Sequence, residues 1–110
     1  MRIVWVDDDT EVIYPVVEPL EEDGHDIDRI RTIKDALDST ETFRMGDLIL
    51  VDMIIPSGGD KVAEEVDYTG PWLLRTLREE HGVKAPAIAF SVVDPSKVEK
   101  ELANLNVVTY

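Results

Sequence analysis

The chain has 110 residues, enough for one domain and too few for two. It is 44% hydrophobic and 32% charged, which predicts a folded domain rather than a disordered segment. Asp and Glu outnumber Lys and Arg by 24 to 11, a formal net charge of −13 that argues against binding to nucleic acid or to an anionic membrane surface. The absence of cysteine excludes disulfides, thiolate metal sites and thiol nucleophiles.

The apolar runs of the chain are short. None approaches the ~18 residues that a membrane span needs. The first residues lead directly into a strand-like run, which is too short and too early for a signal peptide. We therefore expect a cytoplasmic protein.

Five segments are typical of β-strands. The runs at residues 3–6, 48–51, 87–90 and 107–110 are continuously apolar, as in strands that are covered on both faces of a parallel sheet. The segment at residues 26–30 alternates between polar and apolar residues and suits an edge strand.

Helical patterns separate these strands. Apolar residues recur at helical spacing over residues 32–42, 71–80 and 95–105. The pattern over residues 71–80 is the strongest, because Thr69 is available as its cap and Gly82 as its terminator.

Residues 11–22 occupy the place of a first helix, but Pro15 and Pro19 lie inside the segment and predict a short, bent or late-starting helix. Strands that alternate with helices predict an α/β fold with a parallel sheet. The stretch at about residues 57–69 is longer than a usual connection between a strand and a helix. We expect it to cover the functional site or to offer a surface to a partner, with a flexible insertion as the alternative.

Polar residues follow three of the predicted strands. Asp7, Asp8 and Asp9 follow the first, Asp52 ends the third and Ser91 follows the fourth. The carboxyl ends of parallel strands meet at one edge of a sheet, where ligands of open α/β folds bind. These side chains should therefore lie near one another.

The aspartates admit two interpretations. Three neighbouring carboxylates repel one another, and a hard cation such as Mg²⁺ relieves that repulsion. Alternatively, the first acidic run caps a helix, Asp52 is a solvent-facing loop carboxylate and Ser91 is a small residue at a strand end.

The combination is more specific than its parts. An acidic pair after the first strand, Asp52 at the end of the third, Pro56 four residues later and Ser91 after the next strand together resemble the receiver domain of two-component response regulators, the chemotaxis receivers among them. The resemblance covers essentially residues 1–110, and Tyr110 matches the aromatic residue of the family's fifth strand. It implies a single domain with the flavodoxin-like three-layer fold and a five-stranded parallel sheet in the order 2-1-3-4-5.

The resemblance also implies roles for residues. Asp52 would accept a phosphoryl group from a sensor histidine kinase or a phosphotransfer protein. Mg²⁺ would be held by Asp8, by Asp52, by Asp7 through water and by the backbone carbonyl of Ile54. Such a domain is a signalling switch rather than an enzyme with turnover.

Two further residues complete the implied switch. Ser91 would follow the phosphoryl group and Tyr110 would swing inward with it. The family then has a Lys, a Pro and a last helix, none of which follows Tyr110 here. About ten extra residues also precede Gly70, which matches the family's glycine at the start of its third helix.

The missing last helix predicts an apolar sheet face exposed to water. Three outcomes follow: a natural chain that continues past Tyr110, a homodimer that covers the face, or a marginally stable domain.

Two other functions stay open at this point. The first is a receiver-like module that docks partners without switching. The second is a phosphohydrolase of the haloacid-dehalogenase type, whose Asp-x-Asp motif would be Asp7-x-Asp9. That superfamily wants Thr or Val where this chain has Glu11, and it needs a longer chain.

Overall fold

The computed structural model describes residues 1–8, 18–90, 102–103 and 105–109. Its strands are β1 (Arg2–Val6), β2 (Asp26–Ile30), β3 (Leu48–Asp52), β4 (Ala87–Phe90) and β5 (Val107–Thr109). Its helices are α2 (Ile33–Leu37), α3 (Thr40–Met45), α4 (Thr69–Glu80) and the 3₁₀ turn η1 (Ala63–Glu65), and residues 18–22 are also helical.

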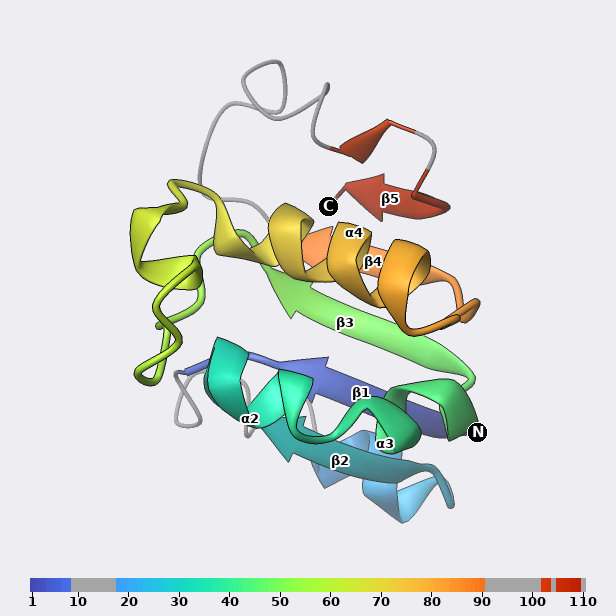
Figure 1. Ribbon diagram of the computed structural model, residues 1–110. Coiled ribbons are helices and arrows are strands. Elements are labelled where there is room, and N and C mark those ends of the chain that lie inside the picture. Colours follow the sequence, from blue (N-terminus) through green and yellow to red (C-terminus); the bar gives the residue numbers. More distant parts are fainter. Residues whose placement is uncertain (9–17, 91–101, 104, 110) are drawn as a thin grey trace.

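The five strands form one parallel sheet in the order β2-β1-β3-β4-β5, as predicted (Figure 1). The alternating segment β2 is an edge strand, again as predicted. The continuous apolar runs β1, β3 and β4 occupy the middle of the sheet.

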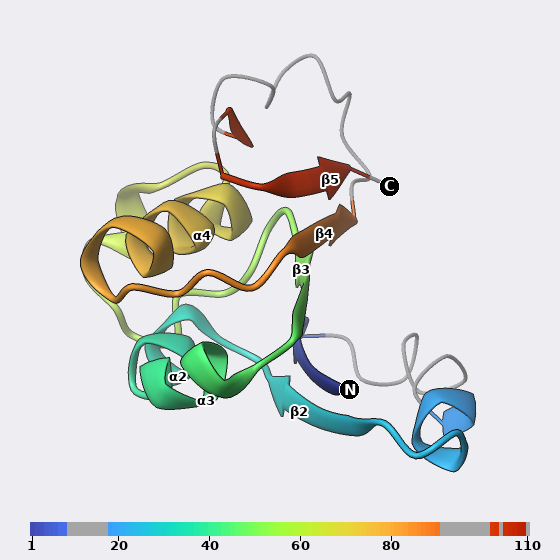
Figure 2. The same ribbon diagram turned by 90° about the vertical axis from the view of Figure 1, so that its right-hand side faces the viewer.

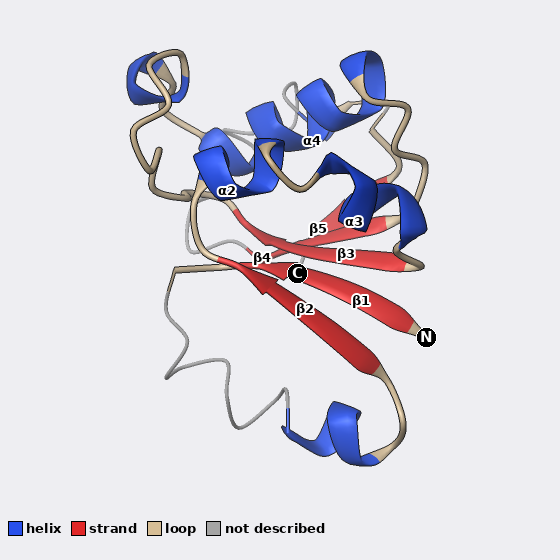
Figure 3. Ribbon diagram, turned by 60° about the horizontal axis from the view of Figure 1, so that its bottom comes forward, coloured by secondary structure: helices blue, strands red, loops and turns tan. Residues whose placement is uncertain are grey.

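The sheet is the middle of three layers. Helices α2, α3 and α4 lie together on one face, and the helical residues 18–22 lie on the other (Figures 2 and 3). The larger core lies under α2, α3 and α4, where side chains of both the strands and the helices are fully buried. No helix in the described parts of the chain is long and apolar enough to cross a membrane.

The helix predicted over residues 32–42 is in fact two short helices. Thr32 caps α2, because its hydroxyl accepts a hydrogen bond from the Asp35 N–H (3.1 Å). The chain then turns at residues 38–39 and starts again as α3, which carries Phe43 into the core with no exposed surface. A single straight helix would place Phe43 at the margin of the apolar stripe, so the break improves its burial.

Helix α4 matches its prediction closely. Leu73, Leu74 and Leu77 form its buried stripe. Gly82 follows with a positive φ of 66°, and the Val83 N–H donates to the Leu77 carbonyl (3.0 Å), which closes the helix end. The helix predicted over residues 95–105 lies largely outside the described residues.

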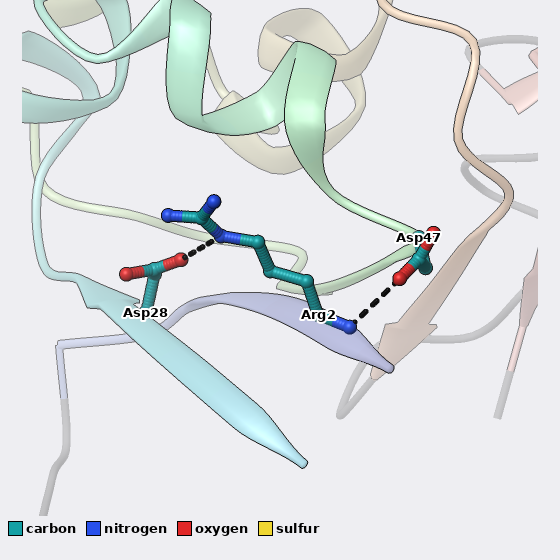
Figure 4. A network of polar contacts seen from close by, with 3 residues as sticks. All are labelled: Arg2, Asp28 and Asp47. Atoms are coloured by element: carbon teal, nitrogen blue, oxygen red, sulfur yellow. Dashed lines mark hydrogen bonds and ion pairs between the residues drawn. The ribbon is translucent and has the colours of Figure 1, made fainter.

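A polar network ties the amino end of the sheet together (Figure 4). The Arg2 backbone N–H donates to Asp47 Oδ2 (2.8 Å), and its Nε donates to Asp28 Oδ2 (3.1 Å). The ion pair joins β1 to β2 but is more than a third exposed, so it contributes at most about 1 kcal/mol.

Candidate functional site

Three aspartates meet at the carboxyl end of the sheet. Asp52 is the last residue of β3, and Asp7 and Asp8 directly follow β1. Val6 of β1 is paired with Val51 of β3, so the two strand ends are level. Carboxylate oxygens of the three residues lie within 4.8 Å of one another.

Asp52 lies half-buried at the centre of this group. The Met53 N–H donates to Asp52 Oδ1 (2.7 Å), and the Ile54 N–H also faces this carboxylate. Burial raises the pKa of Asp52 above its ordinary value, the two N–H donors lower it, and the negative charge of Asp8 raises it again. The net effect is a raised pKa, so the ionised form of Asp52 is less stable here than in water.

This donor set fits a hard divalent cation. Carboxylate oxygens are the ligands that Mg²⁺ prefers, and Mg²⁺ commonly keeps several waters beside one or two carboxylates. Exposed Asp8 leaves the group open to solvent. A cation would also offset the repulsion that contributes to the raised pKa of Asp52.

The structure therefore brings together the acidic residues that the sequence predicted to be close. Asp7, Asp8 and Asp52 form the cluster, and Ile54 follows two residues after Asp52. Asp9, Ser91 and Tyr110 lie outside the described residues, so their roles stay predictions.

The chain after Asp52 is held in place by the start of α4. The Gly70 N–H donates to the Met53 carbonyl (2.9 Å). A Cβ at Gly70 would overlap the backbone carbonyl oxygen of Asp52, so only glycine allows the helix to approach β3 this closely.

Thr69 makes a second attachment that sequence analysis missed. Its buried hydroxyl donates to the Ile55 carbonyl (2.7 Å) and accepts from the Ile55 N–H (2.6 Å). The prediction that Thr69 caps the helix was wrong, because Tyr68 holds the cap position and makes no side-chain capping bond. The only sequence signal was a hydroxyl residue just before Gly70, which gives no hint of a tertiary bond.

The long segment at residues 57–68 contacts the neighbouring helix α2 at its start. The Ile33 N–H donates to the Pro56 carbonyl (2.9 Å), and the Lys34 N–H donates to the Ser57 carbonyl (3.1 Å). Gly58 has a φ of 64°, and a Cβ there would come within 2.5 Å of the Thr32 hydroxyl oxygen. These contacts join the segment to the start of α2.

Within the segment, Asp60 organises η1. Its Oδ1 accepts from the Ala63 N–H (2.9 Å), and Ala63 is buried in the core. The segment projects beyond the carboxyl end of β3, beside α2 and α4 (Figure 1). Its residues are not members of the carboxylate cluster.

Comparison with known proteins gives a clear result for the fold alone. No protein-family model and no curated protein sequence matches the chain. Many solved structures do match it. A two-component response regulator from Clostridium difficile is 20% identical, with a TM-score of 0.74 over 100% of this chain and 80% of that one.

Two other solved structures also combine low sequence identity with a high TM-score. The N-terminal receiver domain of RstA from Klebsiella pneumoniae, in a BeF3-activated form, is 22% identical with a TM-score of 0.70, over 99% of this chain and 85% of that one. The chemotaxis protein CheY4 of Vibrio cholerae is 16% identical with a TM-score of 0.73, over 98% and 82%. The chain has the fold of response-regulator receiver domains. In this receiver fold, the cluster of Asp7, Asp8 and Asp52 lies where β1 and β3 end.

Proposed function

We propose that this receiver-fold domain is a signalling switch in which Asp52 accepts a phosphoryl group in a Mg²⁺-dependent reaction. The observation that carries the proposal is the meeting of three carboxylate side chains within 4.8 Å at the ends of β1 and β3. The sequence resemblance to response regulators and the fold of the structural matches support the same assignment.

The proposed reaction transfers a phosphoryl group to Asp52. A carboxylate oxygen of Asp52 attacks the phosphorus atom of the donor and forms an acyl phosphate. The bond from phosphorus to the donor nitrogen or oxygen breaks, and its electron pair leaves with the donor, which is the phosphohistidine of a sensor kinase or phosphotransfer protein, or a small molecule such as acetyl phosphate.

This step must overcome the repulsion between two negatively charged groups. Nucleophile and phosphoryl group are both negative, so catalysis rests on positioning and on charge neutralisation. Bound Mg²⁺ would supply the positive charge, held by Asp8, by Asp52, by the Ile54 carbonyl and by Asp7 through water. The N–H groups of Met53 and Ile54 orient the Asp52 carboxylate.

The most direct test is intact-mass spectrometry after incubation with acetyl phosphate and Mg²⁺. We expect one added phosphoryl group, about 80 Da, which depends on Mg²⁺ and is absent from Asp52→Asn. Asp8→Asn should slow the reaction strongly, because it removes a metal ligand. Asp38→Asn, the same change at an exposed aspartate on the turn between α2 and α3, is the matched control and should react as the parent does.

Three results would contradict the proposal. A phosphoryl group found on Ser91 or Asp9 would show that the acceptor is misplaced. No adduct with either acetyl phosphate or beryllofluoride would favour a module that docks partners without switching. Continuous release of phosphate from many small phosphoesters would favour a phosphohydrolase.

A further inference from the structure

Away from the carboxylate cluster, a groove runs along the outer side of α4. It encloses about 570 Å³ between α4, the end of α2 and the segment at residues 57–68. Its lining residues are Leu37, Asp60, Val62, Trp72, Arg75, Thr76, Glu79, Glu80 and His81. The segment and α4 lie side by side in Figure 1.

The shape of the groove suits an elongated occupant. Trp72, Arg75, Thr76 and Glu79 recur at the spacing of one helix face, opposite the buried stripe of α4. The residues of α4 that line the groove run from Trp72 to Glu80, a helical length of about 12 Å. A smaller hollow of about 270 Å³ shares Trp72 and Arg75 and extends the groove past the start of α4.

Three apolar side chains that line the groove are within reach of a partner. Val62 is 62% exposed, next to the buried Ala63. Leu37 and Trp72 are only partly buried at the margin of that core. An occupant with apolar side chains would remove all three from water.

The rim of the groove is acidic. The charged lining residues are the acidic Asp60, Glu79 and Glu80 and the basic Arg75, which already pairs with Glu79 (3.6 Å). The chain as a whole carries a net charge of −13. A basic partner would gain from both the local and the overall charge, and an acidic one would be repelled.

We propose that this groove docks a basic, amphipathic helical segment of a partner protein. The apolar face of that segment contacts Val62, Leu37 and Trp72, and its Lys or Arg residues lie beside Asp60, Glu79 and Glu80. Such helix-in-groove recognition uses apolar anchors at helical spacing. The proposal is independent of phosphorylation at Asp52, because none of the lining residues belongs to the carboxylate cluster.

The probe is a synthetic amphipathic peptide of about 18 residues, or five helical turns, with leucines on one face and lysines on the other. Binding is followed by fluorescence anisotropy of a labelled peptide and by amide NMR shifts of the 110-residue chain. We expect saturable binding with shifts concentrated at residues 60–62 and 72–81. A peptide with glutamate for lysine, and one with serine for leucine, should both bind much more weakly.

Two pairs of variants separate the groove from general attraction to an acidic protein. Val62→Ser should weaken binding about fivefold, from lost apolar contact, whereas Val108→Ser, at a similarly exposed valine on β5, should change little. Glu80→Lys should weaken binding several-fold. Glu22→Lys should have a much smaller effect, because Glu22 belongs to the helical residues 18–22, which lie on the other side of the sheet (Figure 3).

The proposal is overturned if the shifts spread over the whole acidic surface. It is equally overturned if Glu22→Lys weakens binding as much as Glu80→Lys does, since the attraction would then be non-specific. Equal effects of Val62→Ser and Val108→Ser would exclude the apolar anchor.

Discussion

The two faces of the sheet are built from the same three central strands but are packed differently. On the first face, Val4, Ile49 and Ala89 belong to a core that also contains the buried side chains of α2, α3 and α4. On the second face, the buried residues of the core in the described parts of the chain are Ile3, Trp5 and Leu50. Their apolar neighbours Leu20, Ile27, Leu48, Ile88 and Phe90 are only partly buried.

This difference in burial shows that the apolar composition of the strands does not by itself determine how densely helices pack on each face of the sheet. Both faces of β1, β3 and β4 are apolar because the runs are continuous rather than alternating. The first face gains its dense core from helices whose apolar stripes match it, such as Leu73, Leu74 and Leu77 of α4. It also carries the groove that we propose as a docking surface. We expect mutational effects to differ accordingly.

The largest effect should come from Gly70, where the first face meets the carboxylate cluster. In Gly70→Ala the new methyl group would overlap the Asp52 carbonyl oxygen, so α4 or β3 must move. We expect a loss of about 3–5 kcal/mol in the free energy of unfolding, measured by urea denaturation, the range of severe single substitutions. Mg²⁺ binding should weaken as well, because Asp52 shifts.

Gly24→Ala is the matched control for Gly70→Ala. A Cβ there meets nothing within 4 Å, although the φ of 90° is strained for alanine. It should cost about 1 kcal/mol from backbone strain alone. Equal losses in the two variants would show that the close approach of α4 to β3 is not decisive.

A matched pair of isoleucines tests the two faces directly. Ile49 on β3 is fully buried on the first face, and Ile88 on the neighbouring strand β4 is partly buried on the second. Ile49→Ala should cost about 3–4 kcal/mol from lost burial and the remaining cavity, and Ile88→Ala about 1 kcal/mol. The readout is the same urea denaturation. If Ile88→Ala costs as much as Ile49→Ala, the contrast between the faces is wrong.

Some features of the fold and of the carboxylate cluster could be predicted from the sequence alone, and others could not. The strands and the carboxylate cluster were predictable, because apolar runs and residues that follow strand ends depend on local pattern and on the geometry of parallel sheets. The strand order was predicted only through the resemblance to receiver domains. The split between α2 and α3 was not, since burying Phe43 is a tertiary gain that periodicity does not reveal. The Thr69 bond to Ile55 and the folding of residues 57–68 against α2 likewise depend on partners distant in sequence.

A smaller effect, of opposite sign, is expected at Asp52. Its pKa is raised in the folded state, chiefly by burial, so ionisation of Asp52 costs stability as the pH rises through the unfolded and then the folded pKa. Asp52→Asn removes that cost and keeps an acceptor for the Met53 N–H. The variant should therefore melt at a higher temperature than the parent at pH 7, without Mg²⁺.

The pH and the metal both provide checks on the Asp52 result. The gain should disappear below the ordinary carboxyl pKa of 3.8, where Asp52 is protonated in both states. Added Mg²⁺ should raise the melting temperature of the parent but much less that of Asp52→Asn. A variant that melts below the parent at pH 7 would mean that the carboxylate stabilises the fold.

The smallest net effect should come from Trp5, the largest buried side chain of the second face. Its ring stacks on Phe90 (centroids 5.9 Å apart, 13° between planes), and its indole N–H is buried with no hydrogen-bond partner among the described residues. An unpaired buried donor costs about 1–3 kcal/mol. Trp5→Phe removes that donor and retains an aromatic ring, but it leaves a small cavity.

The two contributions to Trp5→Phe oppose each other. A cavity of roughly 40 Å³ costs about 1 kcal/mol, similar to the penalty that disappears with the indole N–H. We therefore expect the unfolding free energy of Trp5→Phe to stay within about 1 kcal/mol of the parent, whereas Trp5→Ala should lose about 3–5 kcal/mol. Urea denaturation of both variants measures this. A loss above about 2 kcal/mol in Trp5→Phe would mean that the indole N–H has a partner in solution, because only a satisfied donor adds to the cost of the cavity. The buried donor on the second face would then be satisfied, and the two faces would differ only in how deeply their side chains are buried.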